Sequence, residues 1–418
     1  MIQMCVIGVW KMYVKRRKLI SNIILIFVNI SLFLYIAQNY SKQEVYKKSK
    51  YCKPRRRIGF LKTHKCASSS IQNILLRYVM NNDLNVVLSE NDNYVGYRAH
   101  FNRKLIANTS WEKAHLKYDM FLCHTRWNHS EISNVLSDDG KNEVFYFSIL
   151  RDPVELYRSY WDYYNLTKLY KSDINTFAET VINNPIKYQS KYKNKRPHAF
   201  NQMLTDFGFQ FHDMARSGGI NKTIGLNRLN EKINEIDKTF NLVILADEEY
   251  FEDGIILLKH SLCWTNEDMV NLKRNSFPEN RKSKISEKSR KIIRGNNHYF
   301  FQLSSLISIT PMCDGSLFFL ILDWLWEDYH LYDYFKKKFL LRLEEIGRLR
   351  VEEEKLLLRN FTSKIISQCQ ERKPMARPNI CNYISKGEIS FLEEVRNIQR
   401  EKSLKILELR NDSLNSIT

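Results

Sequence analysis

The sequence predicts an α/β fold with a central parallel sheet, on the basis of its apolar runs and the helices that follow them. Four near-continuous apolar runs have the length of strands: Ile58 to Leu61, Tyr118 to Cys123, Val144 to Leu150 and Leu242 to Ala246. Runs that are apolar on both faces are typical of strands buried in a parallel sheet. Helical stretches are predicted at about 153–164 and 248–262, as alternating strands and helices require. The 418 residues are enough for one large domain with a full core, or for two small ones.

The N-terminal segment is predicted to anchor the chain in a membrane. Residues 19–37 carry no charge and are long enough to span a bilayer as a helix. Basic residues directly precede this run, which favours a cytosolic tail at 1–18. A cleaved signal peptide is the rival interpretation, but Tyr35 stands where a small residue would be needed. Residues 38–57 are polar and basic without a period, and are predicted to form an extended stem.

The charged residues and the glycosylation sequons indicate how the chain is oriented in the membrane and which partners it could bind. Basic residues also follow the span, so the rule that Lys and Arg flank the cytosolic side favours a cytosolic N-terminus by only a small margin. Seven Asn-x-Ser/Thr triplets lie downstream and favour a lumenal domain: Asn39, Asn108, Asn128, Asn165, Asn221, Asn360 and Asn411. Of the net charge of +19, residues 1–57 carry +12, from thirteen Lys and Arg and one acid. Because this excess flanks the membrane, it suits anionic lipid, and we expect no nucleic-acid partner.

The eight cysteines indicate disulfides rather than a metal site. No Cys-x-x-Cys pair or other zinc pattern occurs. Disulfide pairing in a lumenal domain is left open among six residues: Cys52, Cys123, Cys263, Cys313, Cys369 and Cys381. Cys5 precedes the span, which leaves Cys66 as the predicted free thiol.

The turn within residues 60–70 has the composition of an anion-binding loop. It leads from the first predicted strand into an amphipathic helix with apolar residues at helical spacing: Ile71, Ile74, Leu75, Tyr78 and Val79. A helix N-terminus favours an anion, and Lys62 and Lys65 add positive charge there. The serines at 68–70 are expected to cap the helix. An ordinary capped helix start with two solvated lysines fits the same residues. Because the loop contains no glycine, a Walker A loop is not expected.

A second junction follows the strand at Val144 to Leu150. Asp152 is the predicted N-cap of the next helix, and Pro153 suits its first position. Arg151 then projects from the carboxyl end of a strand, where open α/β sheets bind ligands. Ser159 lies two turns into that helix, on the same ridge as Asp152. An Arg fork with a hydroxyl can clamp a phosphate, although an isolated Arg of this kind also pairs readily with a nearby carboxylate.

The other segments are interpreted from composition and spacing. Residues 165–240 are polar, aromatic and rich in Lys and Asn, which suits an insertion that shapes an acceptor site. Residues from about 316 to 365 are predicted to be mainly helical, with three aromatic residues as core packing: Trp324, Trp326 and Tyr329. The tail from about 386 has apolar residues at helical spacing and could lie apart from the core; these residues are Phe391, Leu392, Val395 and Ile398.

Together, the two junctions resemble the paired motifs of Golgi carbohydrate sulfotransferases, and most closely the galactose 3-O-sulfotransferases. The matching motifs are Phe60-Leu61-Lys62-Thr63-His64-Lys65-x-Ala67-Ser68-Ser69, Cys123-His124-x-Arg126-aromatic, Leu150-Arg151-Asp152-Pro153, Asp206-Phe207-Gly208-Phe209, Leu262-Cys263-Trp264 and Leu331-Tyr332-Asp333-Tyr334-Phe335. The resemblance covers roughly residues 58–348. This chain departs from the family pattern at Cys66, where a Thr is usual, and at Trp127, where a Phe is usual.

The resemblance implies a fold and a sulfate donor. The fold would be the sulfotransferase fold, a P-loop NTPase-like three-layer sandwich around a parallel sheet. The donor would be 3′-phosphoadenosine 5′-phosphosulfate (PAPS). Its 5′-phosphosulfate would be held by the first loop, through Lys62, Thr63, His64, Lys65, Cys66, Ala67, Ser68 and Ser69. Its 3′-phosphate would be held by Arg151 and Ser159.

Two catalytic residues and three acceptor contacts are also implied. Lys65 aligns with the family lysine at the bridging oxygen of the donor, and His124 would be the general base, because an unperturbed His titrates near neutrality. A structural His capping a strand end is the alternative for His124, and His129 and His100 are other candidates for the base. Arg126, Asn201 and Phe207 are the predicted acceptor contacts. We expect no metal requirement, because lysines supply the cationic role.

The expected protein is thus a single-pass type II Golgi membrane enzyme with its catalytic domain in the lumen. The sulfotransferase domain would span 58–365, followed by a partly helical extension at 366–418. It would transfer a sulfuryl group from PAPS to the 3-hydroxyl of galactose on a glycolipid or a glycoprotein glycan. The alternatives are a sulfotransferase acting on a uronic acid or amino sugar of a glycosaminoglycan, and an inactive carbohydrate-binding relative. The sequence leaves the acceptor and the oligomeric state open, with a homodimer as one option.

Overall fold

The computed structural model describes residues 26–27, 29–33, 52–91, 93–96, 99–136, 143–182, 200–209, 222–272, 281–294, 325–371 and 379–415. Arg55–Thr418 forms one compact unit and Met1–Pro54 another. Most of the predicted membrane span at 19–37 lies outside the described residues. Within the described ranges, no helix combines the length and apolarity needed to cross a bilayer.

The larger unit is built on a five-stranded sheet in which every pairing is parallel, as predicted. Its strands are β1 (Ile58–Leu61), β2 (Val86–Val87), β3 (Met120–Phe121), β4 (Phe145–Leu150) and β5 (Leu242–Leu245). All of their residues are buried. β3 is shorter than its predicted run, and β2 was not predicted, because two residues are too few to show a strand pattern.

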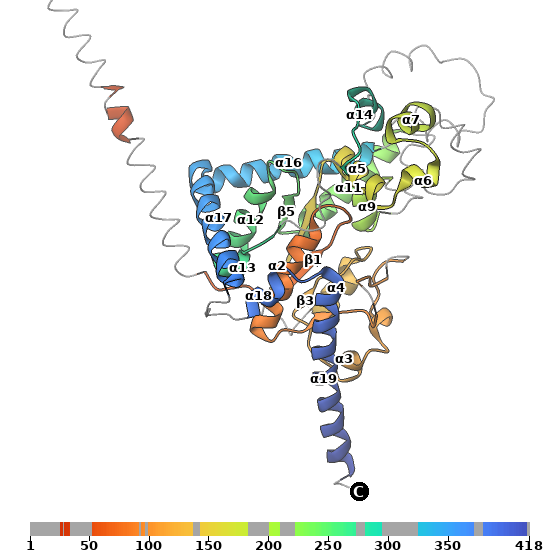
Figure 1. Ribbon diagram of the computed structural model, residues 1–418, viewed down its shortest axis with the longest axis vertical. Coiled ribbons are helices and arrows are strands. Elements are labelled where there is room, and N and C mark those ends of the chain that lie inside the picture. The colour runs from red at the N-terminus through yellow and green to blue at the C-terminus, as the bar shows by residue number, and fades with distance from the viewer. Residues whose placement is uncertain are drawn as a thin grey trace, which may run out of the picture. The chain divides into compact units, whose positions relative to one another are not determined.

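The strand order, β2-β3-β1-β4-β5, determines where a ligand can bind. From β1 the chain moves to one side of the sheet to form β2 and β3, and it then returns past β1 to form β4 and β5 on the other side (Figure 1). β1 and β4 are direct neighbours, with Ile58 opposite Phe145 and Leu61 opposite Ser148. Connections that leave adjacent strands in opposite directions open a crevice at their carboxyl ends. The two predicted anion-binding junctions both begin at this crevice.

Helices follow each of these two strands. α2 (Ser68–Asn82) buries the predicted apolar face, but its N-cap is Ala67, whose side chain offers no cap. The predicted capping by the serines is therefore wrong: the Ser68 hydroxyl instead donates to the Thr63 carbonyl at 2.6 Å. α5 (Pro153–Tyr163) begins as predicted, with the Asp152 carboxylate accepting from the backbone N–H groups of Val154 and Glu155.

The other described helices pack on the sheet or on one another (Figure 1). They are η1 (Arg103–Ile106), α3 (Ser110–Lys113), α4 (His129–Leu136), α6 (Leu166–Tyr170), α7 (Ile174–Phe177), the π-helix η2 (Ala178–Ile182), α9 (Gln202–Asp206), α11 (Lys222–Thr239), α12 (Phe251–Leu262), α13 (Asn266–Met269), α14 (Glu287–Arg294), α16 (Trp326–Ile346), α17 (Arg348–Gln370), α18 (Asn379–Ile384) and α19 (Glu388–Asn415). Helices α12 and α16 pack on β5, and α4 packs on β3. Within 165–240, the ranges 183–199 and 210–221 lie outside the described residues.

Helix α16 confirms the prediction of a helical segment within 316–365 and connects to the core. Trp326 and Tyr329 pack against the main hydrophobic core, while Trp324 lies outside the described residues. The buried Asp328 carboxylate accepts from the backbone N–H groups of Met203 and Leu204, at 3.1 and 2.9 Å. These bonds satisfy donors at the start of α9, which have no partner within the helix.

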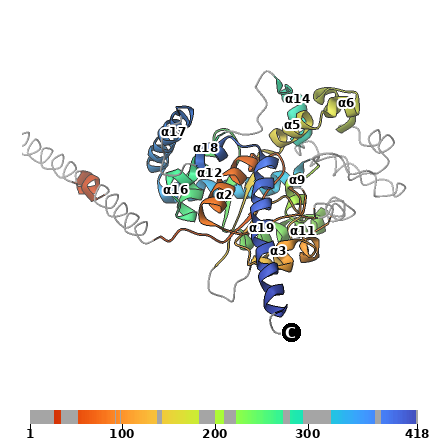
Figure 2. The ribbon, with the colours of Figure 1, turned by 60° about the horizontal axis from the view of Figure 1, so that its bottom comes forward.

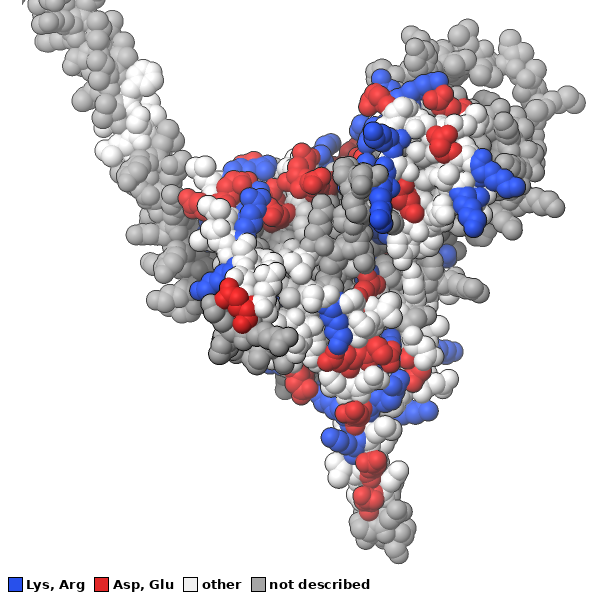
Figure 3. All heavy atoms as spheres, in the orientation of Figure 1, with Lys and Arg blue, Asp and Glu red and all other residues white. Residues whose placement is uncertain are grey.

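The C-terminal tail does not lie apart from the core. Phe391, Leu392 and Val395 of α19 are buried against it, and α19 contacts α2 and α3 (Figure 2). The Gln399 side chain accepts from Val86 N–H at 2.8 Å and donates to Val86 C=O at 3.0 Å. α19 thereby pairs the polar backbone groups of an edge strand, which would otherwise be open to another chain. Acidic and basic side chains alternate along its exposed part (Figure 3).

The states of the cysteines confirm part of the disulfide prediction. Cys369 and Cys381 form a disulfide that joins the end of α17 to α18, and Cys52 and Cys263 each take part in a disulfide too. Cys66 is a buried free thiol, as predicted. Cys123 is likewise outside any disulfide, contrary to expectation; it is buried, and its thiol donates to the Val87 carbonyl at 3.7 Å.

The docking of α19 can be tested by a truncation in its buried face. Phe391→Ala removes a fully buried ring, and we expect it to lower the free energy of unfolding by about 3–5 kcal/mol. Leu409→Ala on the same helix is the matched control, because Leu409 is 70% exposed and should change stability by less than about 0.5 kcal/mol. Denaturant unfolding of both variants provides the measurement. Equal stability of the two variants would show that α19 does not belong to the fold.

Candidate functional site

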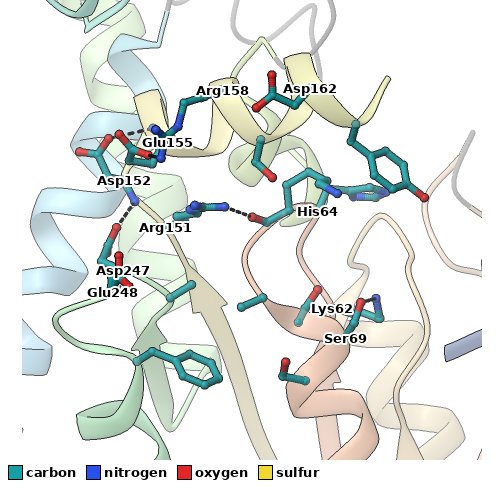
Figure 4. Close-up of a pocket in the computed structure, with 18 of the residues that line it drawn as sticks. Lys62, His64, Ser69, Arg151, Asp152, Glu155, Arg158, Asp162, Asp247 and Glu248 are labelled. Carbon is teal, nitrogen blue, oxygen red and sulfur yellow. Dashed lines mark hydrogen bonds and ion pairs between the residues drawn. The ribbon is translucent and has the colours of Figure 1, made fainter. Parts of the chain in front are cut away.

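A cavity of about 1100 Å³ lies at the carboxyl ends of β1 and β4, and both predicted anion-binding junctions line it (Figure 4). We call it the crevice cavity. One side is formed by the loop after β1, and the other by Arg151, the first turns of α5 and the residues after β5. In Figure 4, Arg151 lies between these two sides and points at the loop. Its Nη1 donates to the Lys65 carbonyl at 3.1 Å, so the two junctions are in direct contact.

The loop between β1 and α2 turns without glycine. Lys65 and Ala67 both adopt the left-handed conformation, with φ of 58° and 53°. For residues with a Cβ this conformation costs about 1–2 kcal/mol each. The cost is offset by bonds that fix the loop, including one from His64 N–H to the Asp206 carboxylate at 2.8 Å. Although the loop lacks the Walker glycines, it still makes a sharp turn into a helix N-terminus.

Two of the predicted donor contacts serve the loop instead of the cavity. The Thr63 hydroxyl donates to the Ile149 carbonyl of β4. The Cys66 thiol donates to the His64 carbonyl at 3.3 Å, and burial raises the pKa of this thiol, which keeps it neutral. Neither side chain is among those that line the crevice cavity. Position 66, where this chain has Cys and the family usually has Thr, therefore belongs to the bonds that hold the loop.

Lys62 is a buried cation in the wall of the cavity. Its Nζ lies 2.9 Å from Nε2 of His124 and 3.3 Å from Oε1 of Glu388, the first residue of α19. Desolvation lowers the pKa of Lys62, and the Glu388 carboxylate partly opposes this shift. Burial disfavours the ionised form of Glu388, but Lys62 and the bonds from Ser69 and Asn93 outweigh it and lower the pKa of Glu388. The contact with Lys62 thus favours the ionised form of Glu388.

Lys65 is the second cation of the loop and is easier to deprotonate than an ordinary lysine. Its Nζ sits 3.5 Å from the centre of the Tyr163 ring, a cation–π contact. Desolvation, together with the nearby charges of Arg151 and Lys62, lowers the pKa of Lys65 to about 8. An anion bound at this position would restore the proton. Lys65 is therefore placed to respond to negative charge in the cavity.

His124, the predicted base, is buried where it reaches the same cavity. Its Nδ1 lies 2.8 Å from the Lys62 carbonyl, which can only accept, so Nδ1 carries the proton and the Nε2 lone pair faces Lys62 Nζ. Desolvation and the neighbouring Lys62 hold the pKa of His124 well below 6.5. The expectation of titration near neutrality is corrected accordingly. His100 and His129, the other candidates, do not line the cavity.

Arg151 and Ser159 share their side of the cavity with cations that the sequence did not single out. Arg158, Arg290 and Lys282 all line it. Arg158 and Arg290 both pair with Glu155, which occupies the ridge between Asp152 and Ser159 (Figure 4). Within the described ranges, no group of three His, Cys, Asp or Glu side chains is arranged to hold a metal ion. Cationic side chains therefore line both sides of the cavity, among carboxylates such as Asp247, Glu248 and Glu388.

The three predicted acceptor residues lie elsewhere. Asn201 is fully buried, and its Oδ1 accepts from Asp328 N–H at 3.1 Å. Phe207 is fully buried and packs edge-on against the Phe240 ring. The Arg126 carbonyl accepts from Phe101 N–H, and none of the three residues lines the crevice cavity. The structure therefore gives no support to their assignment as acceptor contacts.

Tyrosines form an aromatic wall that the sequence analysis missed. Tyr94, Tyr163 and Tyr164 line the cavity, and the rings of Tyr163 and Tyr164 are 55% and 42% exposed. The Tyr94 ring stacks on His124 with 5.0 Å between the centroids. The position of Tyr163, one turn after Ser159 on the same helix, was a signal available in the sequence. Glu388 gave no such signal, because it contacts a loop more than 300 residues away.

Known proteins that are similar in sequence to this chain are named as sulfotransferases. A family model described as galactose-3-O-sulfotransferase matches residues 9–305. Galactosylceramide sulfotransferase of Homo sapiens is 26% identical over 320 residues, which cover 76% of this chain and 65% of that protein. Galactose-3-O-sulfotransferase 2 of Mus musculus is 27% identical over 322 residues, covering 76% and 71%. The chain thus spans about two thirds of the length of these relatives.

The low pKa of Lys65 predicts a pH dependence of anion binding. The probe is 3′-phosphoadenosine 5′-phosphate (PAP), the desulfated form of PAPS. Lys65 attracts it only when protonated, so loss of its proton should leave affinity unchanged up to about pH 7 and lower it roughly tenfold between pH 7 and pH 9. Calorimetric titration gives the dissociation constant at each pH. In Lys65→Arg the side chain stays protonated, and the fall should vanish. An equal fall in both proteins would assign it to another group.

Proposed function

The chain belongs to the galactose-3-O-sulfotransferase family, and on this premise we propose that it transfers the sulfuryl group of PAPS to the 3-hydroxyl of galactose on a glycolipid or a glycoprotein glycan. The observation that carries the proposal is the contact between the two junctions, where Arg151 donates to the Lys65 carbonyl. This contact brings two groups of cations to one cavity. A donor with phosphate at both its 3′ and 5′ ends needs such an arrangement.

We assign the 5′ end of the donor to the loop and the 3′ end to α5. Lys62, Lys65 and Ser69 line the cavity beside the α2 N-terminus, which favours an anion. Arg151 and Ser159 line it on the opposite side and would hold the 3′-phosphate. PAPS supplies an activated sulfuryl group, and every other element of the reaction falls to the side chains of this protein.

In the transfer, the galactose O3 forms a bond to sulfur as the bond from sulfur to the bridging oxygen breaks. The electron pair of the broken bond stays on the phosphate of the leaving PAP. Lys65 would stabilise this developing charge, as preorganised cations do at charge that appears in a transition state. Its pKa of about 8 allows the ammonium to be present at neutral pH. The in-line geometry has the same demands as phosphoryl transfer.

His124 would take the proton of the sugar hydroxyl on Nε2. Its lowered pKa keeps this nitrogen unprotonated at neutral and mildly acidic pH. The lone pair faces Lys62 Nζ at 2.9 Å, so the base becomes available when Lys62 turns toward the donor. One lysine would thereby couple the arrival of the donor to the release of the base.

The aromatic wall is our proposed acceptor side. A sugar ring carries apolar C–H faces that can pack on aromatic rings. Tyr94 stacks on the proposed base, and Tyr163 lies under the proposed catalytic lysine. A galactose placed against this wall would have its hydroxyl between His124 and Lys65. We further propose a Golgi location with a lumenal domain, supported by the uncharged run at 19–37 and the downstream sequons.

The direct test is incubation of the purified lumenal domain with sulfate-labelled PAPS and a panel of glycans. The panel holds galactosylceramide, galactose-terminated N- and O-glycans, and uronic acid polymers, and the linkage of labelled products is determined. We expect label on galactose O3. Transfer to uronic acid polymers alone would replace the proposed acceptor. Absence of both transfer and PAP binding would remove the proposed function altogether.

Variants of the proposed catalytic residues should separate chemistry from binding. Lys65→Ala and His124→Ala are each expected to lower kcat by about 10²–10⁴-fold, because each removes a transition-state interaction. Arg151→Ala should mainly weaken PAP binding, by about tenfold or more, because the lost interaction is with the 3′-phosphate. Kinetics with labelled PAPS and calorimetry with PAP give the two quantities.

Matched controls come from the same residue types away from the crevice cavity. Lys288→Ala, His260→Ala and Arg103→Ala each remove a side chain that pairs with a glutamate outside it, and all three should keep near-wild-type activity. If His124→Ala kept near-full activity, the general base would have to be another residue.

A further inference from the structure

Glu388 places a carboxylate among the groups that face the 5′ end of the proposed donor. It is the first residue of α19 and is only 17% exposed. Its Oε1 lies 3.3 Å from Lys62 Nζ and accepts from the Asn93 amide, while its Oε2 accepts from the Ser69 hydroxyl. Two of these partners, Lys62 and Ser69, are residues that we assign to the binding of PAPS. The carboxylate therefore uses the same hydrogen-bond donors as the incoming anion.

Lys62 needs such a partner because its ammonium is out of reach of solvent. The Lys62 side chain is 2% exposed, and a buried ammonium without a counter-charge is strongly disfavoured. Nε2 of His124 at 2.9 Å offers a lone pair but no charge. Among the described residues, Glu388 is the carboxylate in ion-pair contact with Lys62. A sulfuryl or phosphate group beside Lys62 would supply the same negative charge.

Two anions cannot share these partners. Carboxylate and phosphosulfate oxygens are both acceptors and both negative, so each would leave the other unpaired and repelled in a site of low dielectric constant. When the 5′ group contacts Lys62 and Ser69, Glu388 has to move away. Binding at this end of the donor is therefore an exchange of one anion for another.

The chain around Glu388 allows this movement without undocking α19. Gly387 precedes it, and a Cβ placed there would meet only the Ser390 hydroxyl, at 3.4 Å. The neighbouring Ile389 is 63% exposed. Contacts that anchor this part of the chain lie on both sides of Glu388: Lys386 pairs with Glu394, and Phe391 and Gln399 are buried farther along the helix. A change confined to the first turn would leave them intact.

We propose that Glu388 is an internal counter-ion that the 5′ group of the donor displaces, and that it thereby sets the affinity of the protein for its donor. The proposal rests on the proposed function, because it takes PAPS as the ligand of the crevice cavity. It makes α19 part of the donor site, through a residue outside the family match at 9–305.

The experiment compares the affinity of two nucleotides for wild-type protein and Glu388→Gln. PAP carries a 5′-phosphate, whereas adenosine 3′-monophosphate carries none. The substitution keeps the shape of the side chain and removes its charge. We expect Glu388→Gln to bind PAP about tenfold more tightly, and adenosine 3′-monophosphate with unchanged affinity. Calorimetric titration on the whole lumenal domain gives each dissociation constant.

Controls separate displacement from a general effect of charge. Glu401→Gln removes the same charge from an exposed position of α19 and should leave PAP affinity unchanged. Glu388→Ala tests the same loss with a second side chain and should also tighten PAP binding. Thermal unfolding of each variant checks that α19 stays docked.

The outcomes are distinct. Unchanged or weaker PAP binding in both Glu388 variants would overturn the proposal, and weaker binding would make Glu388 a residue that positions Lys62 for the donor. If the Glu388 variants bound both nucleotides more tightly by the same factor, the effect would be long-range electrostatics, and displacement of Glu388 would be overturned. If wild-type protein binds no PAP at all, the proposed function fails instead.

Discussion

The direct pairing of β1 with β4 is the constraint on which the site depends. Because these strands run parallel and side by side, the loops that follow them start at the same edge of the sheet and leave in opposite directions. One loop carries Lys62 and Lys65, and the other begins with Arg151. The bond from Arg151 to the Lys65 carbonyl closes the gap between them. The separation of the two groups of cations is therefore set by backbone pairing, and flexible side chains make only the final adjustment.

The second theme is the cost of burying positive charge. Three basic side chains that line the crevice cavity are paired with carboxylates: Lys62 with Glu388, His64 with Asp206, and Arg158 with Glu155. Lys65 is different, because its contacts are a tyrosine ring and like charges, and its pKa is accordingly low. The cation with the least compensation is the one that the family pattern places at the bridging oxygen. Its charge is the most readily changed by what enters the cavity.

Sequence reasoning succeeded where the signal is local. The cores of the four apolar runs became strands, Asp152 and Pro153 began a helix as expected, and the two junctions met at one sheet edge. It failed where the structure depends on distant contacts. The docking of α19 rests on Gln399 pairing with Val86, and Glu388 reaches Ser69 across more than 300 residues, which no spacing rule detects. Phe207 belongs to the motif Asp206-Phe207-Gly208-Phe209, and motif membership cannot distinguish a buried structural residue from one that lines a cavity.

The C-terminal segment also determines how the catalytic unit can be isolated. The match to the family model ends at residue 305, and a fragment designed on that boundary would omit helices α16 to α19. It would lack Asp328, whose carboxylate caps α9, and Gln399, which covers the edge of β2. The open edge would invite pairing between chains, and the start of α9 would lose its acceptors. The compact unit is longer than the part that the family model matches, and it includes the buried face of α19.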